Sequence, residues 1–190
     1  MKYFTSDTHF GHYNIISYCS RPFASTAEMD AVMMANLQAS IGEDDELYFL
    51  GDWTMNVLHY AQIKNIRFKH LYFILGNHDR PTKLAAQLAL DGLSDRVTVA
   101  KEMTIDLDGR PIHLVHRPMD ASDDTATLCG HVHEKWLCQR PGAVITEYKN
   151  HQQSEPRTLK QPILNVGVDM HGFRPISAAR VIELLDSTAP

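Results

Sequence analysis

Side chains that bind metals or transfer protons recur at one kind of position in this chain, directly after short apolar runs. They are Asp7, His9, Asp52, Asn77, His78, Asp79, His116, His131 and His133. Imidazole nitrogens, carboxylate oxygens and an amide carbonyl together suit a borderline divalent metal such as Mn, Fe, Co, Ni or Zn. The set contains no cysteine, which disfavours a closed structural zinc site.

The apolar runs predict buried strands by their length and their aromatic or β-branched content. The predicted strands are 2–7, 46–52, 71–77, 111–116, 126–131 and 163–169. Apolar residues at helical spacing predict helices over 25–41, 55–66 and 81–90, the first with a capping box of Ser25 and Glu28. Strands that alternate with helices indicate an α/β architecture with a substantial parallel component. Residues 97–116 predict instead consecutive strands with a tight turn at Asp108-Gly109, which indicates a hairpin or a second, mixed sheet.

The strand positions predict that the polar residues meet in space. Ligands of α/β sheets bind beyond the carboxyl ends of the strands, and each of these side chains lies at or just beyond such an end. Converging Asp and His side chains would repel one another or lie unpaired unless cations held them together. Asp169 and His171 follow the last strand and are weaker candidates for the same rim.

Each motif alone has an ordinary structural explanation. The pair Asp7-x-His9 is a common strand-to-turn sequence, and Gly51-Asp52 is a common turn dipeptide. His131 and His133 are two residues apart and would share one face of an extended segment. The sequence GNHD at 76–79 is the most specific piece. The occurrence of all pieces in order, each after a predicted strand, favours a functional site.

These motifs, from Asp7 to His133, together resemble the calcineurin-like metallophosphoesterases over about two-thirds of the chain. The stretches FTSDTHFGHYNI near the start and LNVGVD near the end are similar to a small bacterial or phage branch. The resemblance implies a four-layer α/β/β/α sandwich, in which two mixed β-sheets lie face to face and helices cover the outer faces. The length of 190 residues predicts one domain, 1–190.

The resemblance also implies a centre of two divalent metal ions, with Mn as the first choice and Fe, Ni, Co or Zn as alternatives. By its motifs, the first ion would be held by Asp7, His9 and His133, and the second by Asn77, His116 and His131. Asp52 would bridge both ions, since a carboxylate can bind two cations whereas an imidazole gives each metal one nitrogen. Such a centre hydrolyses phosphate esters by attack of a metal-activated hydroxide.

Catalytic and substrate-binding roles follow from the same resemblance. His78 is left free of the metals and would act as general acid, with Asp79 orienting its ring. The alternative role of Asp79 is to cap the helix at 81–90. Three further residues are candidate substrate contacts: His12, Arg21 and Arg117. The arginines would clamp phosphate, with surface salt bridges as their alternative role, and a solvated turn histidine is the alternative for His12.

The sequence therefore predicts a binuclear metal-dependent phosphoesterase that hydrolyses a small phosphomonoester or phosphodiester, with a nucleotide-like substrate. One alternative is a small nuclease acting on DNA or RNA, which the net charge of −5 and the lack of a basic tract disfavour. Another is a catalytically weak interaction scaffold of the same fold, which the complete set of predicted metal ligands disfavours. No residue favours a monoester over a diester substrate. No residue favours a particular oligomeric state.

Three cysteines without a CxxC pair predict reduced thiols in a cytosolic chain. No apolar stretch approaches the roughly 18 residues of a membrane span, and the start becomes polar too early for a signal peptide. We therefore expect a cytoplasmic protein of a bacterium or a phage-infected host, without a membrane partner. The polar, proline-punctuated segment 134–162 predicts a loop or hairpin excursion that serves as a lid, a specificity loop or an oligomer contact.

Overall fold

Two five-stranded sheets form the body of the protein, whose computed structural model describes residues 1–149 and 152–187. The first sheet has the order β14-β1-β2-β3-β4, formed by Ile176–Ser177, Lys2–Thr5, Glu46–Phe49, His70–Ile74 and Val97–Ala100. Its strands β1 to β4 are parallel, and β14 is antiparallel. The second sheet has the order β5-β6-β7-β13-β8, formed by Glu102–Leu107, Arg110–Val115, Ala126–Cys129, Ile163–Asn165 and Cys138–Gln139. Both sheets are therefore mixed.

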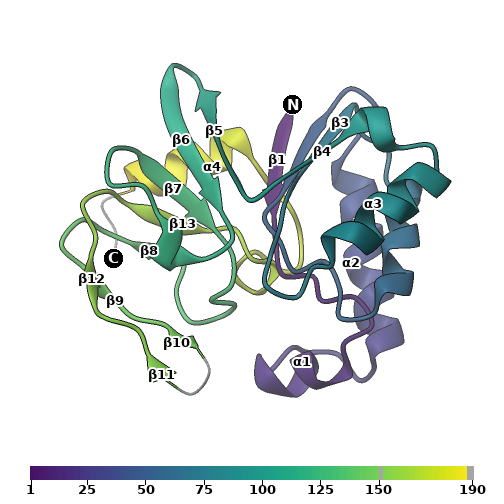
Figure 1. The fold of residues 1–190 in the computed structure, drawn as a ribbon, viewed down its shortest axis with the longest axis horizontal. Coiled ribbons are helices and arrows are strands. Elements are labelled where there is room, and N and C mark those ends of the chain that lie inside the picture. The colour runs from purple at the N-terminus through teal and green to yellow at the C-terminus, as the bar shows by residue number, and fades with distance from the viewer. Residues whose placement is uncertain (150–151, 188–190) are drawn as a thin grey trace.

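The two sheets pack face to face around a shared apolar core (Figure 1). Successive residues of a strand point to opposite faces, so each sheet supplies alternate side chains to this core. Phe4 and Ile74 of the first sheet are fully buried in the same cluster as Leu114 and Leu164 of the second. All six strands expected from the apolar runs are present, and they end one to four residues earlier than predicted.

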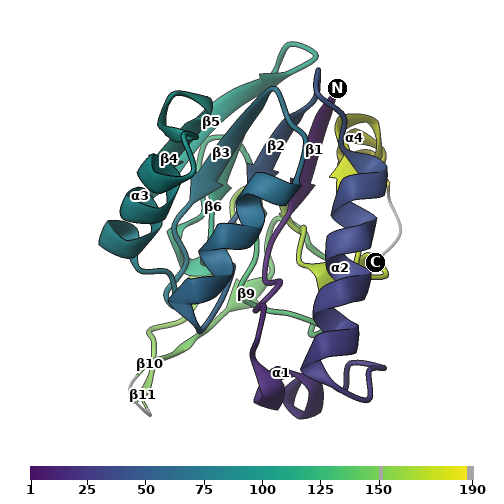
Figure 2. The same cartoon turned by 90° about the vertical axis from the view of Figure 1, so that its right-hand side faces the viewer.

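Helices cover the other face of the first sheet, as Figure 2 shows. They are α2 (Thr26–Ser40), α3 (Pro81–Leu90) and the 3-10 helix η1 (Val57–Asn65). The Ser25 hydroxyl accepts a hydrogen bond from the backbone N–H of Glu28 at 3.2 Å, which confirms the predicted cap of α2. The predicted helix over 55–66 forms as the 3-10 helix η1 and not as an α-helix.

The second sheet is covered in a different way. Helix α4 (Ala178–Asp186) contacts β1, β13 and β14, and so touches both sheets. The other face of the second sheet packs against Ile145 and Leu159 of the segment 134–162. The connection between β6 and β7 forms only the 3-10 turn η3 (Pro118–Asp120). The predicted sandwich of two mixed sheets and helices is confirmed. The segment 134–162 forms part of its second outer layer.

Within residues 134–162, β8 is the edge strand of the second sheet, and a two-part hairpin extends beyond it (Figure 1). Strand β9 (Val144–Ile145) pairs with β12 (Arg157–Thr158), and β10 (Tyr148–Lys149) pairs with β11 (Gln152–Gln153). Residues 150–151 of this segment lie outside the described part of the chain. The predicted turn at Asp108-Gly109 joins β5 to β6, with both residues at positive φ. Within 1–149 and 152–187, no helix combines the length and hydrophobicity of a membrane span.

Candidate metal centre

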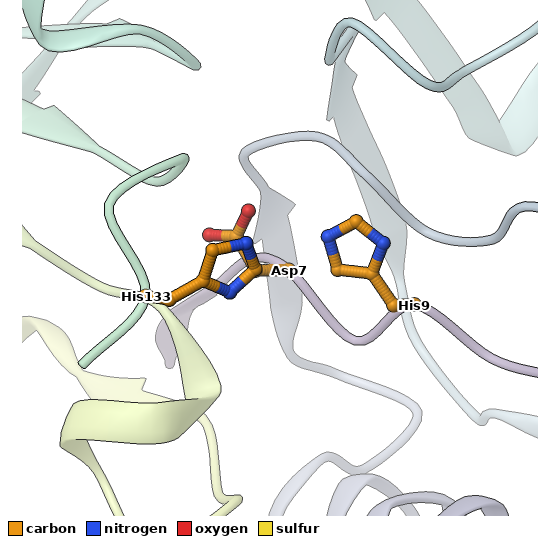
Figure 3. Close-up of side chains that lie close together, drawn as sticks. All are labelled: Asp7, His9 and His133. Atoms are coloured by element: carbon orange, nitrogen blue, oxygen red, sulfur yellow. The ribbon is translucent and has the colours of Figure 1, made fainter. Parts of the chain in front are cut away.

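The loops that follow five strands bring the predicted metal ligands together at one end of the two sheets. These loops follow β1 (Asp7, His9), β2 (Asp52), β3 (Asn77), β6 (His116) and β7 (His131, His133). Six of the residues form two groups, in each of which one donor atom per residue lies within 4.8 Å of the others: Asp7, His9 and His133, and Asp52, His116 and His131. We call them the first and the second donor group. Figure 3 shows the three side chains of the first group around a common space.

The remaining predicted ligand, Asn77, lies beside the second donor group. Its Oδ1 is 3.1 Å from Nε2 of His116. The other ring nitrogen of His116, Nδ1, is 2.8 Å from the carbonyl oxygen of Leu50. Since a carbonyl can only accept, Nδ1 carries a proton and Nε2 faces Asn77 and the site. Asn77 therefore contacts the second donor group through His116.

Asp52 is a member of the second donor group and also faces the first. Its Oδ2 is 3.3 Å from Nε2 of His116 and 3.6 Å from Nε2 of His9. Its Oδ1 accepts a hydrogen bond from the backbone N–H of His78 at 2.9 Å. Burial alone would raise the pKa of Asp52, but the hydrogen bond and charge of His116 lower that pKa below its usual value. Asp52 is thus an ionised carboxylate with one oxygen directed at both groups.

His9 provides the test of whether these residues fit a metal. Its side chain is 2% exposed, and neither ring nitrogen has a hydrogen-bond partner among the described residues. Burial lowers the pKa of His9 to about 2, so the ring is neutral at pH 7. An unsatisfied buried polar group costs about 1–3 kcal/mol. A neutral imidazole with a free nitrogen between the carboxylates of Asp7 and Asp52 is the donor set that a borderline divalent cation would satisfy.

The backbone at the site is strained. Eight non-glycine residues of the described chain have positive φ, and five of them are predicted ligands: Asp7 (60°), His9 (51°), Asp52 (59°), His131 (73°) and His133 (49°). The left-handed region is unfavourable for residues with a Cβ and clusters at functional sites. The loops therefore hold these side chains in directions that a relaxed strand end would not give.

Two glycines of the motifs, Gly76 and Gly130, lie so close to a carboxylate of the site that no side chain fits in their place. A Cβ on Gly76 would lie 2.1 Å from Oδ1 of Asp52, and a Cβ on Gly130 would lie 2.4 Å from Oδ2 of Asp7. Neither distance is possible for a real side chain, so any larger residue would displace a carboxylate of the site. The glycine that precedes each polar residue in these two motifs thus makes room for an acidic residue from a different loop.

Arg21 supports the site from behind and does not face a substrate. Its side chain is buried, and Nε and Nη2 donate to the two carboxylate oxygens of Asp169 at 2.7 and 2.9 Å. Nη1 donates to the carbonyl of Thr8, and Nη2 also donates to the carbonyl of Asp7. With these donors engaged inside the protein, Arg21 is not retained as a phosphate clamp.

Asp169 connects Arg21 to the first donor group. Its Oδ2 is 3.1 Å from Nδ1 of His133. Burial opposes a charge on His133, but the hydrogen bond to Asp169 raises the pKa of His133 to about 10 in the metal-free protein. Because Nδ1 is bonded to Asp169, Nε2 is the nitrogen of His133 that remains for the site. His171, the other weak candidate, bonds through Nε2 to the carbonyl of Asn165.

Asp79 has neither of its two predicted roles. Its Oδ2 accepts from the backbone N–H groups of Asp52 and Gly76, both at 2.8 Å. Its Oδ1 accepts from the N–H of Trp53 at 3.2 Å and from the Tyr60 hydroxyl at 3.3 Å. The N-cap of α3 is the next residue, with no side-chain cap. Asp79 therefore holds the loops after β2 and β3 together, because its buried carboxylate faces those loops and not the ring of His78.

His78 faces a cleft beside the first donor group. Its ring is 39% exposed, and Nε2 is 3.9 Å from Oδ2 of Asp52. The cleft has a volume of about 460 Å³, and its walls include His12, Tyr18 and Met55. Nδ1 of His12 is buried without a hydrogen-bond partner in the described structure. The structure thus brings His78 and His12 to the same cleft at the edge of the site.

Arg117 lies at the opposite edge of the site, paired with an acidic residue that the sequence did not single out. Nε and Nη2 of Arg117 donate to Oε1 of Glu147, the first at 2.7 Å. The same Oε1 is 2.6 Å from Nε2 of His131. Burial lowers the pKa of His131 to about 4, so its ring is neutral at pH 7. Glu147 belongs to the hairpin 134–162, and no strand-end pattern pointed to it.

The chain was compared with protein-family models and with known proteins. No family model matches it. An uncharacterised protein of Methanocaldococcus jannaschii is 26% identical over 190 residues, which cover 97% of this chain and 90% of that protein. The crystal structure of a protein of unknown function from Aquifex aeolicus is similar with a TM-score of 0.66 and 22% identity, over 97% of this chain and 98% of that chain. A novel archaeal phosphodiesterase is similar with a TM-score of only 0.44 and 14% identity, over 87% of this chain and 82% of that chain. The chain therefore shares its fold with the Aquifex protein along nearly its whole length.

Proposed function

We propose that this protein is a metal-dependent phosphoesterase of the calcineurin-like metallophosphoesterase type. The observation that supports the proposal is the convergence of two donor groups with the carboxylate of Asp52 between them. Motifs that are up to 124 residues apart in the chain, such as Asp7 and His131, are in direct contact. Two adjacent sites that share one carboxylate are the arrangement by which two-metal hydrolases bind both ions.

In this proposal each donor group holds one divalent ion, Mn first and Fe, Ni, Co or Zn as alternatives. Asn77 completes the second group, and Asp52 serves both. When bound, the ions would activate water and stabilise the charge of a phosphoryl group. His9 would contribute a neutral nitrogen, which its burial keeps unprotonated.

His78 would donate a proton to the leaving oxygen of the substrate. Its half-exposed ring can reach a molecule in the cleft, while its backbone is fixed by the N–H bond to Asp52. Asp79 has no catalytic role in this proposal, because its carboxylate is engaged by the neighbouring loops. Among the described residues, the carboxylate within ion-pair distance of the His78 ring is that of Asp52, whose Oδ2 is 3.9 Å from Nε2.

The cleft supports a small substrate that carries an aromatic group, such as the base of a nucleotide. Tyr18 is 70% exposed and Met55 is 45% exposed, although both are large apolar side chains on a cleft wall. Lys135 lies on the same wall and can pair with a phosphate. His9 and His78 line the same cleft as Tyr18. In this proposal the enzyme acts on a small molecule in the cytoplasm. It needs neither a nucleic-acid partner nor a membrane partner.

The function is tested by hydrolysis of bis-p-nitrophenyl phosphate and p-nitrophenyl phosphate with Mn²⁺. We expect turnover by the wild type, a loss of at least 100-fold in Asp52→Asn, and turnover lost with metal retained in His78→Ala. His70→Ala, at the far end of β3, serves as the matched histidine control. A metal-loaded wild type that hydrolyses neither ester, nor any member of a panel of nucleotides, dinucleotides and cyclic nucleotides, would refute the proposal.

The cleft is tested separately with two tyrosines of the same helix, α1 (Tyr13–Tyr18). Both tyrosines are 70% exposed, but only Tyr18 lies on the cleft wall. Stacking of a base on an aromatic ring contributes about 1–3 kcal/mol, so Tyr18→Ala should raise KM for a nucleotide by about 5- to 150-fold. Tyr13→Ala should leave KM unchanged. Equal effects of the two substitutions would exclude the cleft as the binding site for the base.

A further inference from the structure

The hairpin 134–162 places one acidic side chain at the metal centre. Glu147 lies between β9 and β10, and its side chain is 14% exposed. Its backbone is fixed across the hairpin, because its N–H donates to the Ser154 hydroxyl at 2.9 Å and its carbonyl accepts from the Ser154 N–H at 2.7 Å. The carboxylate is therefore held in place from within the hairpin.

The contact with His131 determines which ring nitrogen carries a proton. An ionised carboxylate can only accept hydrogen bonds, and Oε1 of Glu147 is 2.6 Å from Nε2 of His131. Nε2 therefore donates to Glu147, and Nδ1 is the ring nitrogen that remains for the site. His131 belongs to the second donor group, so Nδ1 is the atom that it offers to a metal.

The first donor group has the same construction. Arg21 holds Asp169 through two hydrogen bonds, and Asp169 contacts the outward nitrogen of His133. At the second group, Nε and Nη2 of Arg117 hold Glu147 by donating to one carboxylate oxygen, Oε1. Each group thus contains a histidine whose outward nitrogen contacts a carboxylate that an arginine fixes. Such outer carboxylates orient the ring of a metal-binding histidine and increase its basicity.

We propose that Glu147 is a positioning residue for the second metal site, and that the hairpin 134–162 thereby controls occupancy of that site. The inference rests on the proposed function for the presence of a metal, but not for the orientation of His131. The two carboxylate–arginine pairs differ in exposure: the side chains of Arg21 and Asp169 are 0% and 3% exposed, and those of Arg117 and Glu147 are 24% and 14% exposed. The second site therefore depends on a surface hairpin, whereas the first depends on the protein interior.

Metal binding to Glu147→Ala, measured by titration calorimetry with Mn²⁺, tests the proposal. We expect two ions in the wild type and a 10- to 100-fold loss of affinity for one ion in Glu147→Ala, the range typical of outer carboxylates. The other ion should bind with unchanged affinity, which also shows that the variant is folded. Glu147→Gln should recover most of the loss, because its amide oxygen can accept the same hydrogen bonds. Glu155→Ala, an exposed residue of the same hairpin, is the matched control.

A second measurement does not require metal. The ¹⁵N shifts of the His131 ring in the metal-free protein should report the tautomer protonated at Nε2, and Glu147→Ala should shift it toward a mixture. Wild-type affinity for both ions in Glu147→Ala, or a ring protonated at Nδ1 in the wild type, would overturn the inference. Selective loss of one ion in Glu147→Ala would support it even if the wild type hydrolysed no phosphate ester, so the two proposals can fail separately.

Discussion

Replacement of Asp79 by alanine should lower the free energy of unfolding by about 3–5 kcal/mol. The carboxylate accepts three backbone N–H groups, from Asp52, Trp53 and Gly76, and one hydroxyl. The N–H groups of Asp52 and Trp53 are buried and that of Gly76 is partly buried, and each would cost about 1–3 kcal/mol without an acceptor. Relief of the buried charge offsets part of this sum, since burial raises the pKa of Asp79.

The effect can be measured by urea denaturation of the metal-free protein, followed by the fluorescence of its two tryptophans. A loss of this size corresponds to a fall in melting temperature of about 6–20 °C for a chain of this length. Asp79→Asn should cost less, about 1–3 kcal/mol, because the amide oxygen keeps the two bonds at 2.8 Å and only the N–H of Trp53 and the hydroxyl of Tyr60 lose their acceptor. Asp95→Ala, an exposed acidic residue, should change stability by less than about 0.5 kcal/mol.

One result would refute this account of Asp79. If Asp79→Ala lost activity while its unfolding free energy stayed within about 1 kcal/mol of the wild type, the carboxylate would act on the chemistry and not on the loops. An equal loss of stability in the alanine and asparagine variants would also contradict the hydrogen-bond argument, because only the alanine removes every acceptor.

Three other outcomes are expected. Gly130→Ala should lose one ion, measured as metal content by mass spectrometry, because the added Cβ would lie 2.4 Å from a carboxylate oxygen of the first donor group; two retained ions would contradict this. Arg21→Lys should cost about 3–5 kcal/mol in urea denaturation, since lysine cannot make the bidentate bond to buried Asp169; a change in KM alone would restore the phosphate-clamp role. Metal binding at pH 7 should release about two protons, and affinity should rise up to about pH 10, because partners raise the pKa of His116 to about 9 and that of His133 to about 10 against the effect of burial. Calorimetry in buffers of different ionisation enthalpy measures this release, and a value near zero would contradict it.

The part of the site that was predictable from sequence is the part that obeys a rule of strand topology. Asp7 and His131 are far apart in the chain, but both follow strands, and the carboxyl ends of parallel strands meet at one edge of the structure. The apolar runs also identify the six main strands, because the period of buried residues is a local property. Helix 55–66 is tighter than predicted, since periodicity alone does not distinguish an α-helix from a 3-10 helix.

The residues that sequence reasoning missed depend on how distant segments pack. Glu147 reaches His131 only because the hairpin folds back over the second sheet, and nothing near residue 147 encodes that path. Arg21 and Asp169 are 148 residues apart, so their pairing could not be inferred from either motif. For Asp79 the local sequence suggested a helix cap, but the chain enters α3 one residue later and directs the carboxylate to the loops.

The positive φ angles of five proposed ligands have a consequence for evolution in the laboratory. Strain of about 1 kcal/mol at each position would sum to about 5 kcal/mol, which equals the whole stability of some domains. Glycine at such a position removes the strain together with the side chain. A library of random variants selected for thermal tolerance alone should therefore accumulate glycine at Asp7, Asp52 and His131. Selection for robustness, without selection for metal, would remove the centre.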